Sequence, residues 1–193
     1  MAASWVEICN LGLIALGSQP IASLTEGSNN ANLLAASYRA LIDEVTVEHE
    51  WACAGMRQAI NPLSDAPDGD EYGYQYQLPV SPMCLKIRGV DPDSPYEQMG
   101  DKLLSNEDQL TLIFTAQITN PTLIPPLLTR AMGMKVAEFL APKIAQNNTL
   151  TQLMQAKYEA ALLKAMWADN RGKRRRDEDT AGSEERQRID EVT

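Results

Sequence analysis

Two helix-forming stretches near the start of the chain decide its fold: WVEICNLGLIAL at residues 5–16 and ANLLAASYRALIDEVTVEHEW at residues 31–51. Between them lie the break GSQP at residues 17–20 and a polar turn at residues 26–30. Apolar residues recur at helical spacing in both, at Val6, Cys9, Leu13 and Leu16 and at Leu34, Tyr38, Leu41 and Val45. Each stretch therefore predicts an amphipathic helix, the first ended by Gly17 and the second capped by Asn29 or Asn30.

The hydrophobic period changes from 3.6 to 2 between residues 72 and 118. Alternating apolar residues predict one strand at Tyr72, Tyr74 and Tyr76 and another at Leu110, Leu112, Phe114, Ala116 and Ile118. A third, shorter strand is expected at residues 84–90. Turns are expected at residues 91–95 and at Gly100-Asp101.

Helical periodicity returns after Pro121. Pro125-Pro126 suits a first helical turn, and the apolar face that follows runs to about Pro142. Thr149 with Gln152 is a capping-box pair that opens a last helix. We therefore predict an α+β fold, mainly α, with a four-helix-bundle-like body formed by residues 1–60 and 121–169. Residues 61–120 would form a small inserted antiparallel β region, and residues 170–193 a charged, flexible tail.

Composition excludes several classes of protein. No run of about 18 apolar residues is present, so no membrane span is expected. The first residues lack the basic region of a secretory signal. Cys9, Cys53 and Cys84 are too far apart for a Cys-x-x-Cys pair and are expected to be reduced thiols of a protein folded in the cytoplasm.

The net charge of −9 is unevenly distributed along the chain. From Asn170 onward seven basic residues balance seven acidic ones, so the body before this point carries the whole −9. DNA binding requires Lys or Arg side chains that displace counterions from phosphates. An acidic body therefore argues against a module that grips DNA.

Three candidate sites in the body are better explained by structural roles. His49, the only histidine, lies between two glutamates but has no nucleophile at a recognisable spacing, so a helix-surface or contact role is favoured. The acidic cluster at residues 65–71 lacks the spacing of an EF-hand loop and is expected to be a solvated loop. Alternate tyrosines at residues 72–76 are expected to pack rather than to stack on bases. No catalytic residue, metal site or cofactor is predicted.

The charged tail contains the one candidate binding site, formed by Arg171, Lys173, Arg174, Arg175 and Arg176. Acidic residues follow the run immediately and weaken its field over about 10 Å. Binding to a protein surface is therefore favoured. The alternative is a nucleic-acid-binding module that uses the same basic run.

Several segments also carry a family resemblance. They are LGLIALGSQPI at residues 11–21, the second helical stretch through Trp51, QYQLP at 75–79, CLKI at 84–87 and the Leu-rich helices after Asn120-Pro121. In order and spacing they resemble the tail tubular protein A family, the head-to-tail adaptors of short-tailed bacteriophages. The resemblance covers residues 5 to about 169 and leaves the charged tail out.

This resemblance implies a structural virion protein at the head–tail junction, assembled in the cytoplasm of a bacterial host. It implies a homo-oligomeric ring, twelve-fold in that family, whose helical bundle forms the wall between the portal protein and the tail nozzle protein. The β region would face the nozzle or tail fibres, and the C-terminal segment would reach toward the portal. DNA would pass through the channel without specific binding. The charge of −9 on the body separately predicts that the inner wall of such a ring is acidic, the alternative being that these acids only keep a soluble surface hydrated. No enzymatic activity or catalytic residue is implied.

Overall fold

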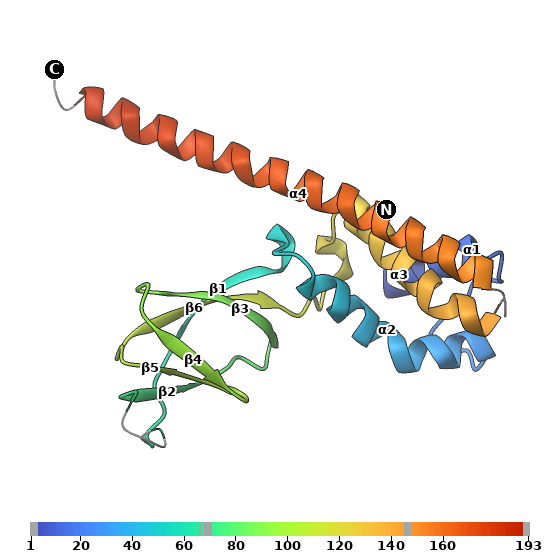
Figure 1. Cartoon of the computed structure of the whole chain (residues 1–193), viewed down its shortest axis with the longest axis horizontal. Coiled ribbons are helices and arrows are strands. Elements are labelled where there is room, and N and C mark those ends of the chain that lie inside the picture. The colour runs from blue at the N-terminus through green and yellow to red at the C-terminus, as the bar shows by residue number, and fades with distance from the viewer. Residues whose placement is uncertain (1–3, 66, 68–70, 145–147, 191–193) are drawn as a thin grey trace. The chain divides into compact units, whose positions relative to one another are not determined.

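The computed structural model describes the backbone of residues 4–65, 67, 71–144 and 148–190, and the side chains of these residues up to Lys173. Within these residues the chain forms four α-helices and two three-stranded antiparallel sheets, so the predicted α+β, mainly α class is confirmed (Figure 1). The chain divides into a helical unit, residues 1–41 with 122–193, and a β unit, residues 42–121.

Helix α1 (Trp5–Ala15) has defined signals at both ends. The Ser4 hydroxyl accepts a hydrogen bond from the Glu7 N–H at 3.1 Å, and the Glu7 carboxylate accepts one from the Ser4 N–H at 2.7 Å. This reciprocal pair is a capping box. Gly17, with φ of +69°, follows the helix as predicted, and the Ser18 N–H returns to the Leu13 carbonyl at 2.9 Å.

Helix α2 (Asn29–Val47) begins close to its predicted start but ends four residues before the predicted end at Trp51. Its cap is Ser28 rather than Asn29 or Asn30, because the Ser28 hydroxyl accepts a hydrogen bond from the Ala31 N–H at 3.2 Å. The helix stops at Val47, and residues 48–50 form a turn before Trp51. Its first part, to Leu41, belongs to the helical unit.

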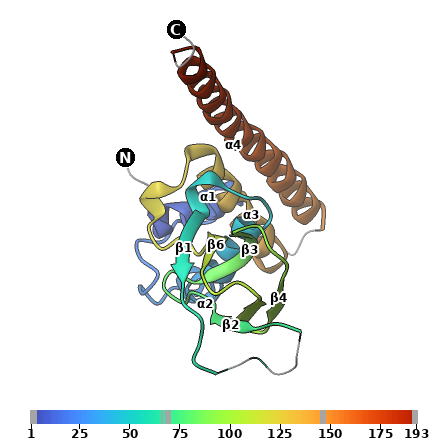
Figure 2. The ribbon, with the colours of Figure 1, turned by 90° about the vertical axis from the view of Figure 1, so that its left-hand side faces the viewer.

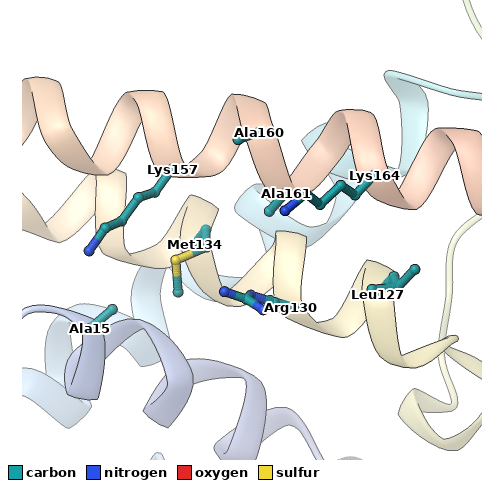
Figure 3. Close-up of a pocket in the computed structure, with 8 residues that line it drawn as sticks. All are labelled: Ala15, Leu127, Arg130, Met134, Lys157, Ala160, Ala161 and Lys164. Atoms are coloured by element: carbon teal, nitrogen blue, oxygen red, sulfur yellow. The ribbon is translucent and has the colours of Figure 1, made fainter.

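Helix α3 (Pro126–Ile144) lies between α1 and α4 (Asn148–Asp190) (Figures 1 and 3). Its start at Pro126 agrees with the prediction. The core between α1, α2 and α3 includes Cys9, Leu13, Leu34, Val136 and Leu140. Helix α4 buries Met154, Tyr158, Ala161 and Ala165.

A close approach of α1 and α3 depends on two glycines. A Cβ on Gly12 would lie 2.6 Å from Val136 Cγ1 and 2.8 Å from the carbonyl oxygen of Gly133. A Cβ on Gly133 would lie 2.7 Å from the Cβ of Leu11. The two helices therefore pack at a distance that only glycine permits at these positions.

Residues 170–190 of the predicted flexible tail are helical in the structure, where α4 continues as one helix to Asp190 (Figures 1 and 2). The physical reason is that the segment is extended from a packed helix and needs no new nucleus. Lys, Arg, Glu and Ala, which make up half of residues 170–193, also have high helix propensity. Residues 191–193 lie outside the described residues.

The β unit contains two sheets that share one core. Strands β1 (Gly55–Ile60), β6 (Leu110–Ala116) and β3 (Cys84–Asp91) form one sheet in that order. Strands β2 (Tyr74–Gln77), β5 (Lys102–Ser105) and β4 (Tyr96–Met99) form the other. Tyr76 and Leu103 of the second sheet pack with Leu112 and Phe114 of the first, so the sheets form a small sandwich (Figure 1). Two 3₁₀ turns, η1 (Ala52–Ala54) and η2 (Pro121–Leu123), complete the elements.

The β unit is wider than the predicted insertion at residues 61–120, because it begins at Ile42. Three side-chain hydrogen bonds hold the end of α2 within it. The Trp51 indole N–H donates to the Val45 carbonyl at 2.9 Å, and the Gln117 amide donates to Asp43 at 2.6 Å. The Arg88 guanidinium donates to the Trp51 carbonyl at 2.9 Å. Strands β2, β3 and β6 confirm the sequence prediction, whereas β1, β4 and β5 were not predicted.

Changing Gly12 to alanine should destabilise the helical unit. The added methyl group overlaps Val136 and the Gly133 backbone, so α1 and α3 must move apart. We expect the free energy of unfolding, measured by urea denaturation, to fall by about 1–3 kcal/mol. The matched control is Gly172→Ala, because a Cβ there meets no atom within 4 Å. An equal stability for Gly12→Ala and wild type would contradict the close packing.

Alkaline pH should destabilise the protein through Cys9. Burial raises the pKa of this thiol from 9.0 to about 11. As the pH rises above 9, the unfolded chain releases this proton first, so stability is lost between the two pKa values. Relative to Cys9→Ala, the wild type should lose on the order of 2–3 kcal/mol of unfolding free energy between about pH 8 and about pH 11. Parallel pH profiles of the two proteins in urea denaturation would contradict this expectation.

Candidate functional site

Three cations repeat along one side of α4. Lys157, Lys164 and Arg171 follow one another at intervals of seven residues, which places them on the same side of a helix. All three are exposed. We call these residues the α4 cation row.

A groove lies beside this row, between α3 and α4 (Figure 3). It has a volume of about 420 Å³. Its lining residues come from α1, α3 and α4: Ala15, Leu127, Arg130, Met134, Lys157, Ala160, Ala161 and Lys164. Three of the eight are alanines, whose small side chains leave the space open, and Met134 and Leu127 add further apolar surface. We call this hollow the α3–α4 groove.

The cations of the α3–α4 groove are not neutralised within the described part of the chain. No described carboxylate pairs with Arg130, Lys157 or Lys164. Lys135, on another side of α3, instead pairs with Glu138 at 3.3 Å and lies 4.9 Å from the ring centre of Tyr158. The groove therefore combines an apolar lining with three positive charges that are available to a partner.

A second hollow continues the groove along α4. It has a volume of about 360 Å³ and shares Leu127 and Lys164 with the first. Leu163 and Trp167 also line it, and Trp167 is 64% exposed. The Arg171 guanidinium carbon lies 4.6 Å from the Trp167 ring centre. We call Leu163, Trp167 and Arg171 the Trp167 patch.

Exposure of this kind is unusual for a large aromatic residue. Tryptophan buries a large apolar area when it packs, and an exposed apolar patch rimmed by charge marks an interaction site in soluble proteins. Trp51, by comparison, is 1% exposed and forms part of the core. The Trp167 patch and the α3–α4 groove therefore form one continuous surface suited to a protein partner.

The structure describes two of the five predicted tail cations in full. Arg171 is exposed and stacks on Trp167. Lys173 forms an ion pair with Asp169 at 3.0 Å, so part of its charge is neutralised within α4. The side chains of Arg174, Arg175 and Arg176 lie outside the described residues. Arg171 is thus the predicted site residue that joins the Trp167 patch.

Acidic and basic residues are segregated between the two units. The β unit carries fourteen acidic and four basic side chains, a formal charge of −10. Residues 1–41 and 122–173 of the helical unit carry five acidic and eight basic side chains, a formal charge of +3. The acidic excess expected along a ring wall made of helices therefore belongs to the β unit instead.

Other residues singled out by the sequence belong to the β unit, whereas the α3–α4 groove belongs to the helical unit. The His49 ring packs edge-on against Trp51, with ring centres 4.7 Å apart. Tyr76 is fully buried in the β core, which confirms the packing prediction for that residue, whereas Tyr74 is partly exposed. Asp68 and Asp70 of the acidic loop lie outside the described residues.

The described part of the chain contains neither a candidate metal-binding cluster nor a candidate membrane-spanning helix. Its His, Cys, Asp and Glu side chains form no group of three or more that could hold a metal ion. None of its helices combines the length and the hydropathy needed to cross a membrane.

Sequence reasoning missed Arg130, Lys157, Lys164 and Trp167. A signal for part of the site was present, because Lys157, Lys164 and Arg171 repeat every seven residues and Trp167 lies on the turn between the last two. Arg130 has no such signal, since it reaches the groove from α3 (Figure 3).

No protein-family model matches this chain, and no curated protein sequence matches it.

Trp167 and Trp51 should differ sharply in their effect on stability. Trp167→Ala removes an exposed ring and one cation–π contact, so the free energy of unfolding should fall by less than about 1 kcal/mol. Trp51→Ala removes a buried ring and its hydrogen bond, and should cost about 3–5 kcal/mol. Urea denaturation of both variants checks this. A large loss for Trp167→Ala would mean that the ring is part of the core.

Proposed function

We propose that this chain is a structural virion protein, a ring-shaped head-to-tail adaptor that joins the portal protein of a short-tailed bacteriophage to its tail nozzle. The observation that carries the proposal is the continuous surface of α3 and α4. It combines an apolar groove, cations without a carboxylate partner among the described residues, and the exposed Trp167, which are features of a protein-binding surface.

The division of the chain into two units supports the same role. The helical unit is interrupted by the β unit, in the order that the resemblance to head-to-tail adaptors implies. Under the proposal, the helical unit forms the ring wall and the β unit faces the nozzle or tail fibres. The ring would have twelve copies and would sit at the head–tail junction, after assembly in the cytoplasm of the bacterial host.

Helix α4 is the proposed contact with the portal. It continues to Asp190 and extends well beyond Pro126, the residue at which the neighbouring α3 begins (Figure 1). The Trp167 patch lies at the start of this extension, where a partner could bury the indole ring and pair with Arg171. The remaining tail cations, Lys173 and Arg174 to Arg176, extend the same basic segment.

The role proposed here is not enzymatic and requires no cofactor. Its chemistry is burial of apolar side chains and pairing of charges between subunits. DNA would pass through the ring without sequence-specific contacts. With a charge of −10, the β unit would repel phosphate wherever it borders the channel.

A nucleic-acid-binding module is the second candidate function, and one observation favours it. The α4 cation row places three positive charges on one side of a helix, and the basic run follows it in the sequence. Such a row could contact phosphates, and its binding would weaken steeply with salt. Tight, salt-sensitive binding of duplex DNA by the purified chain would favour this candidate over the adaptor.

The portal contact can be tested with the double variant Trp167→Ala/Arg171→Glu. Because these residues provide the exposed ring and its cation, we expect the affinity for the cognate portal protein to fall about tenfold or more, or about 1.4 kcal/mol. Binding of the full-length chain to purified portal assemblies can be measured by surface plasmon resonance. Removal of residues 170–193 should have a similar effect and leave the helical fold intact.

Lys143→Glu is the matched control. Lys143 is also an exposed cation over an aromatic ring, 4.4 Å from the ring centre of Phe139, but it lies at the end of α3. This variant should bind the portal like the wild type. Equal binding by the wild type, the Trp167/Arg171 double variant and the truncated chain would refute the proposed portal contact.

A further inference from the structure

We propose that the α3–α4 groove binds the acidic β unit of a second copy of this chain. The inference rests on the ring assembly of the proposed function and names the contact between neighbouring subunits. It would make that contact head-to-tail, because each copy would offer a groove on one unit and an acidic surface on the other.

Charge complementarity selects the second copy as the occupant. The helical unit up to Lys173 has a formal charge of +3, and the β unit has one of −10. Arg130, Lys157 and Lys164 have no carboxylate partner among the described residues. The β unit supplies such carboxylates in large excess, and complementary charge both steers association and fixes its register.

The β4 edge of the β unit has the side chains that the groove requires. Strand β4 is an outer strand of its sheet, and all four of its residues are exposed. Tyr96 and Met99 offer apolar side chains, while Glu97 and the nearby Asp93 offer carboxylates. The groove has the matching pattern, with alanine, leucine and methionine at its lining and cations at Arg130, Lys157 and Lys164.

This pairing joins two different surfaces, so it is a heterologous contact. Each copy uses its groove once and its β4 edge once, and repetition of the contact gives a ring if the rotation closes. A two-fold dimer does not arise from a single contact of this kind, because its interface would bring the same patch of each subunit together.

Carbodiimide cross-linking tests the contact directly, because it joins a lysine amine to a carboxylate only where the two groups touch. The sample is a mixture of ¹⁵N-labelled and unlabelled full-length chains at low salt. Mass spectrometry should find mixed-isotope links from Lys157 or Lys164 to Asp93 or Glu97. Their yield should fall about tenfold between about 0.05 M and about 0.5 M salt, as screening increases. Mixed links that do not involve these residues, links within one chain only, or no links would overturn the inference.

Charge reversal supplies the decisive control. Lys157→Glu/Lys164→Glu and Asp93→Lys/Glu97→Lys should each lose the mixed-isotope links when alone. The contact would then bring together only carboxylates or only amines, which carbodiimide does not join and which also repel each other. Mixing the two variants should restore cross-linking, now between the reversed residues of the two chains. Lys143→Glu, outside the groove, should cross-link like the wild type. The inference would be overturned if the mixture of the two variants did not recover cross-linking. It would also be overturned if Lys157→Glu/Lys164→Glu kept its contact with a second copy and instead lost binding of duplex DNA.

This experiment is separate from the portal test. Loss of the predicted links with portal binding intact would reject the subunit contact and leave the adaptor role standing. If the predicted links form but the chain binds no portal, the contact between subunits is supported and the adaptor role is rejected.

Discussion

The close packing of α1 against α3 is the constraint on which the helical unit depends. Gly12 and Gly133 allow the two backbones to approach until a single methyl group at either position would overlap the other helix. Packed interiors transmit such constraints, because their side chains interdigitate with few voids. The contact fixes α3, and α3 in turn supports α4 on its other side. The position of the α3–α4 groove follows from this order of packing.

Helix α4 divides its residues between stability and recognition. Met154, Tyr158, Ala161 and Ala165 are buried, which anchors the first part of the helix. The cation row and Trp167 are exposed on the same helix and contribute little to the core. A long helix can carry both functions because residues seven apart repeat on one side, so a binding row and a packing face do not compete.

The sequence predicted those parts of the fold that local signals determine. Pro126 at the start of α3, Gly17 after α1 and the alternation in β6 all act over a few residues, and the structure agrees with each. Strand β1 could not be predicted from alternating apolar residues, because it has no buried face. Five of its residues are exposed and one is intermediate. Its pairing with β6 supplies the order that its own sequence lacks.

The candidate site was less predictable than the fold. Arg171 was identified from the basic run, but Arg130 joins the groove only because α3 and α4 pack side by side. The charge segregation was also hidden, since it depends on where the units divide. A boundary at residue 42 rather than 61 assigns four acidic residues of the segment 42–50 to the β unit. The sequence therefore showed that the body is acidic, but not that its acidic residues are concentrated in the β unit.

Electron microscopy of the chain bound to a purified portal tests the central claim most directly. We expect a closed ring in which each α3–α4 groove faces the acidic β unit of its neighbour, and in which Trp167 and the distal part of α4 contact the portal. A chain that binds as a monomer or as a two-fold dimer would contradict the account. A closed ring in which the α3–α4 groove and Trp167 remain exposed to solvent would also contradict it.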